Sequence, residues 1–193
     1  MATGMRAEIR RIIGNREIAE GYHELVFEVD SDFWAEAGQF TTIRISSGAT
    51  PLLRRPFAFA SCASGRASII YQRRGGGTEL LAGKREGDGL DIIAPLGNAW
   101  PLPGQSERAV LAAGGIGMGP ILFLAQELKK AGRQVELYIG ARSGVFLPEE
   151  SFFGDLKPQL ATDDGSRGAR GTVADLLPRE YPAPPRFYAC GPE

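Results

Sequence analysis

The chain has 193 residues, and its 22 Lys and Arg residues nearly balance its 23 Asp and Glu residues, giving a formal net charge of −1. This balance excludes a strong overall attraction to nucleic acid or to an anionic membrane. Hydrophobic residues make up 43% of the chain, but no apolar run has the length of a transmembrane helix or the position of a signal peptide. We therefore expect a soluble, cytoplasmic protein.

Cysteine and histidine are too few for a metal site or a disulfide framework. Cys62 and Cys190 are the two cysteines, and His23 is the one histidine. The cysteines lie far apart and neither belongs to a CxxC pair. We expect no bound metal.

The first half of the chain reads as short β-prone segments separated by turn-forming residues. Strands are expected at 7–13, 24–29, 40–45, 57–61, 67–72 and 90–93, with one short helix at 78–84. Six strands at this spacing predict a small closed barrel. Two pairs of groups in this half could bind a diphosphate: Arg54 with Arg55, and the Gly75–Gly77 run with Thr78. Taken alone, an arginine pair at a strand edge is usually just exposed, and a Gly-Gly-Gly run is usually just a turn.

A segment at 101–107 resembles a linker, and a β-α-β alternation follows it. Strands are expected at 109–113, 135–139, 159–162 and 187–190, with helices at 121–130, 149–153 and 172–177. This order predicts a parallel sheet whose ligand lies at the carboxyl ends of the strands.

The clearest local motif runs from the strand at 109–113 through glycines into a helix. Gly114, Gly115, Gly117 and Gly119 allow backbone to approach a phosphate, and Pro120 suits a first helical turn. The pattern departs from G-x-G-x-x-G, and a purely structural turn remains the alternative. Arg142, after the next strand, could bind a cofactor phosphate or be a solvated surface residue.

In their order along the chain, these motifs resemble the ferredoxin-NADP reductase superfamily. The Arg54-Arg55-Pro56 segment, the Gly-x-Gly-Thr turn and the 162–166 segment further resemble the electron-transfer subunit of bacterial dihydroorotate dehydrogenase. The resemblance covers nearly the whole chain and rests on Gly38-Gln39-Phe40, Leu53-Arg54-Arg55-Pro56-Phe57, Gly75-x-Gly77-Thr78, Gly87-Asp88, Gly97, Gly114-Gly115-Ile116-Gly117, Gly140-Ala141-Arg142-Ser143, Thr162-Asp163-Asp164-Gly165-Ser166 and Cys190-Gly191-Pro192.

The resemblance implies a six-stranded Greek-key FAD-binding barrel (1–100), a linker (101–107) and a Rossmann-like parallel-sheet NAD(P)-binding domain (108–193). It implies that Arg55 and the Gly77-Thr78 turn bind the FAD diphosphate, while Phe57 packs near the isoalloxazine and Tyr71 near the ribityl or adenosine part. The implied cofactor-binding residues are Arg55, Pro56, Phe57, Ala58, Tyr71, Gly76, Gly77 and Thr78 for FAD, and Gly114, Gly115, Ile116, Gly117, Gly140, Ala141, Arg142, Asp163, Cys190, Gly191 and Pro192 for the nicotinamide dinucleotide. Ala58 and Cys190 would stand nearest the reacting atoms, and no acid–base residue is required because hydride passes directly between two cofactors.

Two departures from the family pattern stand out. The family usually has Ser or Thr at the position of Ala58, where a hydroxyl reaches flavin N5, and Ser61 is a possible substitute. Relatives also continue into a cysteine-rich segment that binds a 2Fe-2S cluster, whereas this sequence stops at Glu193. Two cysteines cannot supply four thiolates, so we expect no cluster here and a second domain that is incomplete at its C-terminus.

The expected function is FAD-dependent electron transfer between NAD(H) and an FMN-containing, dihydroorotate-oxidising partner of pyrimidine biosynthesis, assembled as a heterotetramer. A ferredoxin-NADP or sulfide reductase subunit of the same superfamily is the close alternative. A non-catalytic cofactor-binding module and a nucleic-acid-binding barrel are alternatives of other classes, and near-zero net charge disfavours the last. The choice between NADH and NADPH and the direction of electron flow stay open.

Overall fold

The computed structural model describes residues 5–46, 48 and 53–192. Contacts divide the chain into two compact units, Met1–Glu17 with Gly21–Trp100 and Ile18–Glu20 with Pro101–Glu193. Each unit has its own sheet and its own buried residues.

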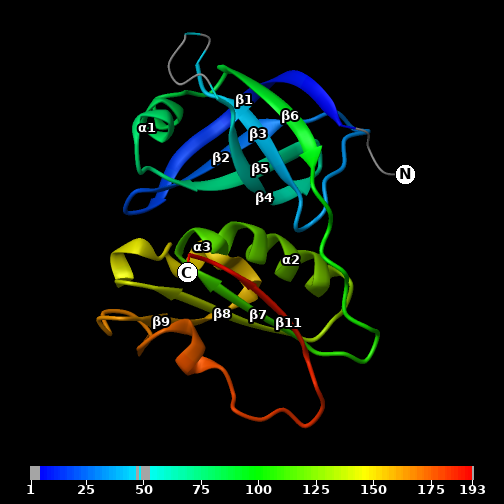
Figure 1. Ribbon diagram of the computed structural model, residues 1–193, viewed down its shortest axis with the longest axis vertical. Coiled ribbons are helices and arrows are strands. Elements are labelled where there is room, and N and C mark those ends of the chain that lie inside the picture. Colours follow the sequence, from blue (N-terminus) through cyan, green and yellow to red (C-terminus); the bar gives the residue numbers. More distant parts are fainter. Residues whose placement is uncertain (1–4, 47, 49–52, 193) are drawn as a thin grey trace. The chain divides into compact units, whose positions relative to one another are not determined.

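The first unit is the predicted barrel, and its six strands close on themselves in the order β1-β2-β5-β4-β3-β6 (Figure 1). The pairs β1–β6, β2–β5, β3–β4, β3–β6 and β4–β5 are antiparallel. The strands are β1 (Arg6–Ala19), β2 (Tyr22–Glu28), β3 (Phe40–Arg44), β4 (Arg55–Ala63), β5 (Arg66–Gln72) and β6 (Gly89–Leu96). The fold expected for the first half is thus confirmed.

Alternate residues of the barrel strands fill its interior, as the period of two in a β-strand requires. Leu25, Phe27, Phe59 and Ile69 are fully buried. The ring of Phe59 lies 6.5 Å from that of Phe27 and 6.2 Å from that of Phe33. These inward residues make a continuous apolar core that holds the surrounding strands together.

Strand β1 is longer than the expected 7–13 and continues to Ala19. Gly14 and Asn15, which lie outside the expected strand, belong to it in the structure. Space around Gly14 is open, and the Asn15 side chain is fully hydrogen-bonded to neighbouring elements. Local turn preference is therefore overridden by barrel closure.

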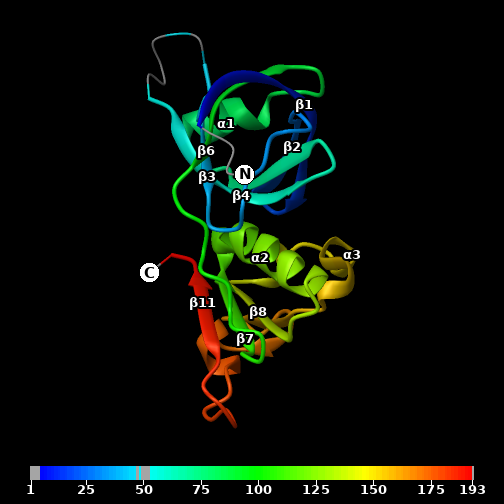
Figure 2. The same cartoon turned by 90° about the vertical axis from the view of Figure 1, so that its right-hand side faces the viewer.

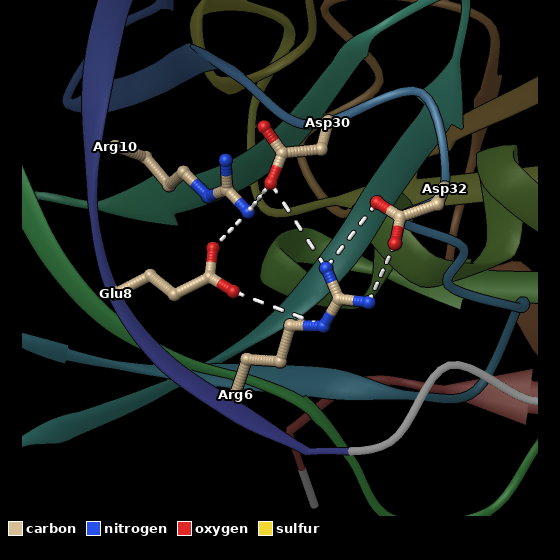
Figure 3. Close-up of polar contacts among 5 residues, drawn as sticks. All are labelled: Arg6, Glu8, Arg10, Asp30 and Asp32. Atoms are coloured by element: carbon tan, nitrogen blue, oxygen red, sulfur yellow. Dashed lines mark hydrogen bonds and ion pairs between the residues drawn. The ribbon is translucent and has the colours of Figure 1, made fainter.

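An alternating charge network fastens the segment after β2 onto β1 (Figure 3). The Arg10 side chain, 9% exposed, pairs with Glu8 and donates to Asp30 at 2.7 Å. Arg6 donates to Asp32 at 2.7 Å. Because Arg10 is buried, its two carboxylate partners offset a desolvation cost that an unpaired guanidinium would carry in full.

Helix α1 (Gly76–Ala82) follows β5 and lies beside the barrel in Figures 1 and 2. It begins two residues earlier than the expected 78–84. Leu81 is fully buried and anchors this short helix.

The second unit is a parallel five-stranded sheet in the order β10-β9-β8-β7-β11. Its strands are β7 (Ala109–Gly114), β8 (Val135–Ala141), β9 (Gln159–Thr162), β10 (Ala169–Arg170) and β11 (Arg186–Cys190). The expected parallel sheet is confirmed, and the two-residue β10 is an addition that sequence did not predict.

Helix α2 (Met118–Lys130) packs on one face of this sheet (Figures 1 and 2). The remaining helical segments are short: η1 (Gly115–Gly117), η2 (Gly144–Phe146), α3 (Glu150–Phe153), η3 (Gly154–Leu156) and η4 (Val173–Leu176). The expected helix at 172–177 is instead the 3-10 turn η4. Thr172 and Asp175 cap its start, and Pro178, two residues beyond its end, disfavours a longer helix. Among the described residues, no helix is long and apolar enough to span a membrane.

Candidate functional site

The arginine motif and the glycine turn of the barrel lie at the same barrel end. Arg55 begins β4, and Gly75 follows the end of β5. Strands β4 and β5 are antiparallel neighbours, so the start of one lies beside the end of the other. The ring centroids of Phe57 on β4 and Tyr71 on β5 lie 6.0 Å apart, which agrees with this pairing of the two strands.

The two adjacent arginines have different surroundings. Arg54 donates to the Asp91 carboxylate at 2.6 Å and to the Asp91 carbonyl at 3.0 Å. The guanidinium of Arg55 donates to the Leu53 carbonyl at 3.0 Å, and the residue is half-exposed. Arg55 is therefore the member of the pair that keeps donors for an anionic ligand, since a guanidinium has five N–H groups.

The start of α1 presents backbone donors in open space. Its first helical hydrogen bond joins the Glu79 N–H to the Gly75 carbonyl, which leaves the N–H groups of Gly76, Gly77 and Thr78 without an acceptor inside the helix. A Cβ added to Gly75 or Gly76 would meet nothing within 4 Å. Backbone N–H groups and a nearby arginine are the donor set that a diphosphate requires, so these residues fit FAD.

The Thr78 hydroxyl is used inside the turn. Its Oγ1 accepts from the Arg74 N–H at 2.9 Å and the Gly75 N–H at 3.2 Å, and it donates to the Gly75 carbonyl at 3.0 Å. The structure thus gives Thr78 a shaping role, and its direct contact with a diphosphate stays a prediction.

The residues predicted beside the flavin occupy different depths. Phe57 and Ala58 are half-exposed and Pro56 is exposed. Tyr71 is 1% exposed, and its ring packs behind Phe57. Burial raises the pKa of Tyr71 to about 12. A direct contact between Tyr71 and a cofactor stays a prediction, whereas its support of Phe57 is observed.

Ser61 is committed to another partner. Its hydroxyl lies 2.7 Å from that of Ser68 on β5. Either hydroxyl can donate in this pair, so Ser61 can accept from Ser68 and keep its own proton for another acceptor.

In the second unit, the predicted residues gather at one edge of the sheet. Gly114 lies beside Gly140, Ala113 beside Cys190, and Ala141 beside Thr162 in the strand register. The strand order reverses at β7, which has β8 on one side and β11 on the other. In open parallel sheets, ligands bind at the carboxyl ends of strands at such a reversal.

Backbone at this edge is packed so closely that glycine is required. A Cβ on Gly117 would overlap the Cys190 carbonyl and lie 2.7 Å from the Gly191 nitrogen. A Cβ on Gly191 would lie 3.0 Å from the Gly114 carbonyl oxygen. The purely structural interpretation of these glycines therefore holds for Gly117, and it is compatible with a ligand role for the turn.

The other residues predicted for the nucleotide surround this edge. Ile116 is half-buried, while Arg142, Asp163 and Pro192 are exposed. The Asp163 N–H donates to the Ala141 carbonyl at 3.1 Å. Cys190 is a free cysteine, and burial raises the pKa of its thiol, so the group is neutral at physiological pH.

An open hollow, here called the acidic hollow, lies near the ends of β8 and β9. The residues that line it are Ser143, Gly144, Val145, Glu149, Glu150, Ser151, Ser166 and Arg167. The Ser166 hydroxyl donates to Asp164 at 2.6 Å and accepts from the Gly144 N–H at 2.7 Å. Hydrogen bonds from the Ser166 hydroxyl and N–H lower the pKa of Asp164 to about 2. Arg167 donates to the carbonyls of Leu147 and Pro148 at 3.1 and 2.8 Å.

Sequence reasoning missed the groups that support the barrel site. Asn15 bonds to Tyr71 and to α1, and His23 stacks on Tyr71 with ring centroids 5.3 Å apart. Burial lowers the pKa of His23, so the ring is neutral at physiological pH. An asparagine in the middle of a strand is unfavourable by propensity, and this was the one available signal. Among the described residues, no cluster of three metal-ligating side chains occurs.

Comparisons with known proteins agree with this geometry. No family model matches the chain. The dihydroorotate dehydrogenase B (NAD(+)) electron transfer subunit of Bacillus caldolyticus is 40% identical over 165 residues, covering 82% of this chain and 63% of the relative. That of Bacillus pumilus is 37% identical over 195 residues, covering 97% and 75%. The structure of an NADH-dependent reduced ferredoxin-NADP oxidoreductase, reported for flavin-based electron bifurcation, superimposes with a TM-score of 0.78 at 28% identity, covering 96% of this chain and 68% of that one.

The barrel, the parallel sheet and the glycine turns define the fold of ferredoxin-NADP reductase-type FAD- and NAD-binding proteins. Within this class, the chain belongs to the family of dihydroorotate dehydrogenase B electron transfer subunits. It spans 63% of the length of the relative from Bacillus caldolyticus and of the one from Geobacillus kaustophilus.

Proposed function

We propose that this chain transfers electrons between NAD(H) and a partner subunit, with FAD bound to the barrel unit and the dinucleotide bound to the second unit. The observation that carries the proposal is the glycine turn at 114–117, at the carboxyl end of β7, where the strand order reverses. Arg55 and the start of α1 lie at the same end of the barrel, and this placement supports FAD binding.

In the proposed reaction the protein acts by placement. FAD, when bound, exchanges two electrons with NADH and passes them on singly. Arg55 and the N–H groups at the start of α1 bind the diphosphate, and Phe57, supported by Tyr71, packs near the flavin ring. The turn at 114–117 binds the dinucleotide, with Cys190 nearest the nicotinamide. No side chain needs to exchange a proton.

We propose NADH rather than NADPH as the nucleotide. Glu149 and Glu150 line the acidic hollow, and Asp164, bonded to Ser166 at its wall, is ionised at neutral pH. Arg167 already donates to two carbonyls. A 2′-phosphate in this hollow would meet like charges, whereas a ribose hydroxyl can donate to a carboxylate.

The proposed partner is an FMN-containing subunit that oxidises dihydroorotate, assembled with this chain as a heterotetramer in the cytoplasm. The relatives at 37–41% identity are electron transfer subunits of dihydroorotate dehydrogenase B, which supports this partner. A ferredoxin as acceptor has weaker support, at 28% identity. Copurification of the chain with a dihydroorotate-oxidising subunit would decide between the two.

The test is an anaerobic titration of the purified chain. We expect a yellow protein whose flavin absorbance bleaches on addition of NADH, with an initial rate at least about tenfold that with NADPH, which corresponds to about 1.4 kcal/mol. The double variant Glu149→Gln/Glu150→Gln should narrow this ratio, and Glu180→Gln, at an exposed position outside the hollow, should leave it unchanged. Yellow protein that does not bleach would indicate a non-catalytic module, and failure to bind FAD would refute the proposal.

A further inference from the structure

The side chain of Asn15 joins three elements of the barrel unit. From β1, its amide Nδ2 donates to the carbonyls of Leu81 at 2.9 Å and Lys84 at 3.0 Å, at the end of α1. Its Oδ1 accepts from the Tyr71 hydroxyl of β5 at 2.9 Å. Both donors and the acceptor of one side chain are thus used, each in a direction that only an amide satisfies.

Helix α1 depends on such a contact. With seven residues it is too short to persist by itself. The local backbone bonds at its end, such as that from the Lys84 N–H to the Leu81 carbonyl, do not tie the helix to the barrel strands. Leu81 anchors the helix through burial, but apolar contact is non-directional. The two hydrogen bonds from Asn15 fix the position of the helix along its axis, and they thereby fix the turn from which α1 begins.

The same amide also orients the ring pair. The Tyr71 side chain is 1% exposed and its hydroxyl is held by Asn15, while its ring meets that of Phe57 edge-on at 6.0 Å and 70°. A rotation of Tyr71 would move the surface against which Phe57 packs, because close-packed interiors transmit such shifts.

We propose that Asn15 is a positioning residue of the FAD site, holding the glycine turn of α1 and the Tyr71–Phe57 ring pair at a fixed separation. The inference rests on the proposed function, in which the turn binds the diphosphate and Phe57 packs near the flavin ring. Asn15 itself touches neither in this scheme and acts through α1 and Tyr71.

The experiment measures FAD affinity of the full chain. Asn15→Asp keeps the shape of the side chain but removes both N–H donors and turns a carboxylate toward two carbonyls. We expect the Kd for FAD to rise about tenfold to a hundredfold. Tyr71→Phe is the matched variant, since it removes one hydroxyl and leaves the bonds to α1 intact, and we expect a rise of about threefold or less. Asn15→Leu, which adds no charge, serves if Asn15→Asp does not fold.

The readout separates positioning from general stability. FAD is titrated into each apoprotein by flavin fluorescence at a temperature well below its melting point, and melting of the apoprotein is followed in parallel. A purely structural Asn15 would lower the melting temperature and leave the Kd unchanged, which would overturn the inference while wild-type FAD binding upheld the proposed function. A wild-type chain that binds no FAD would refute both.

Discussion

At the scale of single residues, Ala58 and Gly117 differ in how much space surrounds the Cα atom. Ala58 is half-exposed on β4 and lies opposite Phe40 on β3, so a larger side chain has room there. Gly117 is buried, and its φ of −65° and ψ of −9° suit any residue, but the space around it does not. A larger side chain can therefore be introduced at position 58, whereas close packing prevents one at position 117.

A hydroxyl introduced at position 58 should change the midpoint potential of the flavin more than the affinity for FAD. In Ala58→Ser, we expect the FAD Kd to stay within about twofold of wild type, while the flavin midpoint potential shifts by about 20 mV, the two-electron equivalent of one hydrogen bond of about 1 kcal/mol. Redox titration of both proteins measures this. An unchanged potential would mean that the position does not face the flavin.

Adding one methyl group at Gly117 should damage the second unit. Its Cβ would overlap the Cys190 carbonyl, and the atoms in the way are backbone. We expect Gly117→Ala to destabilise the unit by about 2–3 kcal/mol and to weaken NADH binding. Gly104→Ala is the control, because its Cβ would meet the nearest atom at an ordinary 3.7 Å. Equal thermal melts for the two variants would contradict the expectation.

At the scale of elements, the barrel unit combines apolar closure with directional polar contacts. The interior residues hold the strands together, but the segment after β2 is fastened by the Arg6–Glu8–Arg10–Asp30–Asp32 network and α1 by Asn15. Such contacts contribute little to the free energy of unfolding when every partner is present. Removing one partner lowers stability strongly when it leaves a buried polar group unpaired.

The charge network can be tested by removing partners in different combinations. The double variant Glu8→Gln/Asp30→Asn leaves the buried Arg10 without a carboxylate, and we expect a loss of about 3 kcal/mol in the free energy of unfolding. Arg10→Met removes the charge itself, and we expect a change within about 1 kcal/mol. Denaturant unfolding measures both. A larger loss from Arg10→Met than from the double variant would show that the ion pairs are net stabilising.

At the scale of the whole molecule, the sequence pattern predicts those features that depend on residues close together in the chain. The six barrel strands and the parallel sheet follow from alternation and turn residues, and the glycine turn at 114–117 could be predicted because its residues are contiguous. The register that brings Gly114, Gly140 and Cys190 to one edge follows from the parallel order.

Contacts between distant residues were beyond sequence reasoning. The bonds from Asn15 to Leu81 and Tyr71, and the pairing of Ser61 with Ser68, depend on barrel closure rather than on spacing. The 172–177 segment is predicted as a helix, but the structure forms only a four-residue 3-10 turn there, and Pro178 after it disfavours continuation. The burial of Tyr71 likewise depends on the strands around it.

The division of the chain into two units has an optical consequence. The sequence holds two tryptophans, Trp34 and Trp100, and both belong to the barrel unit. Intrinsic indole fluorescence therefore reports on that unit by direct emission, while the sheet that carries the glycine turn emits only through its tyrosines. Two-domain chains need not unfold in one step, so a single emission trace would follow half of this molecule.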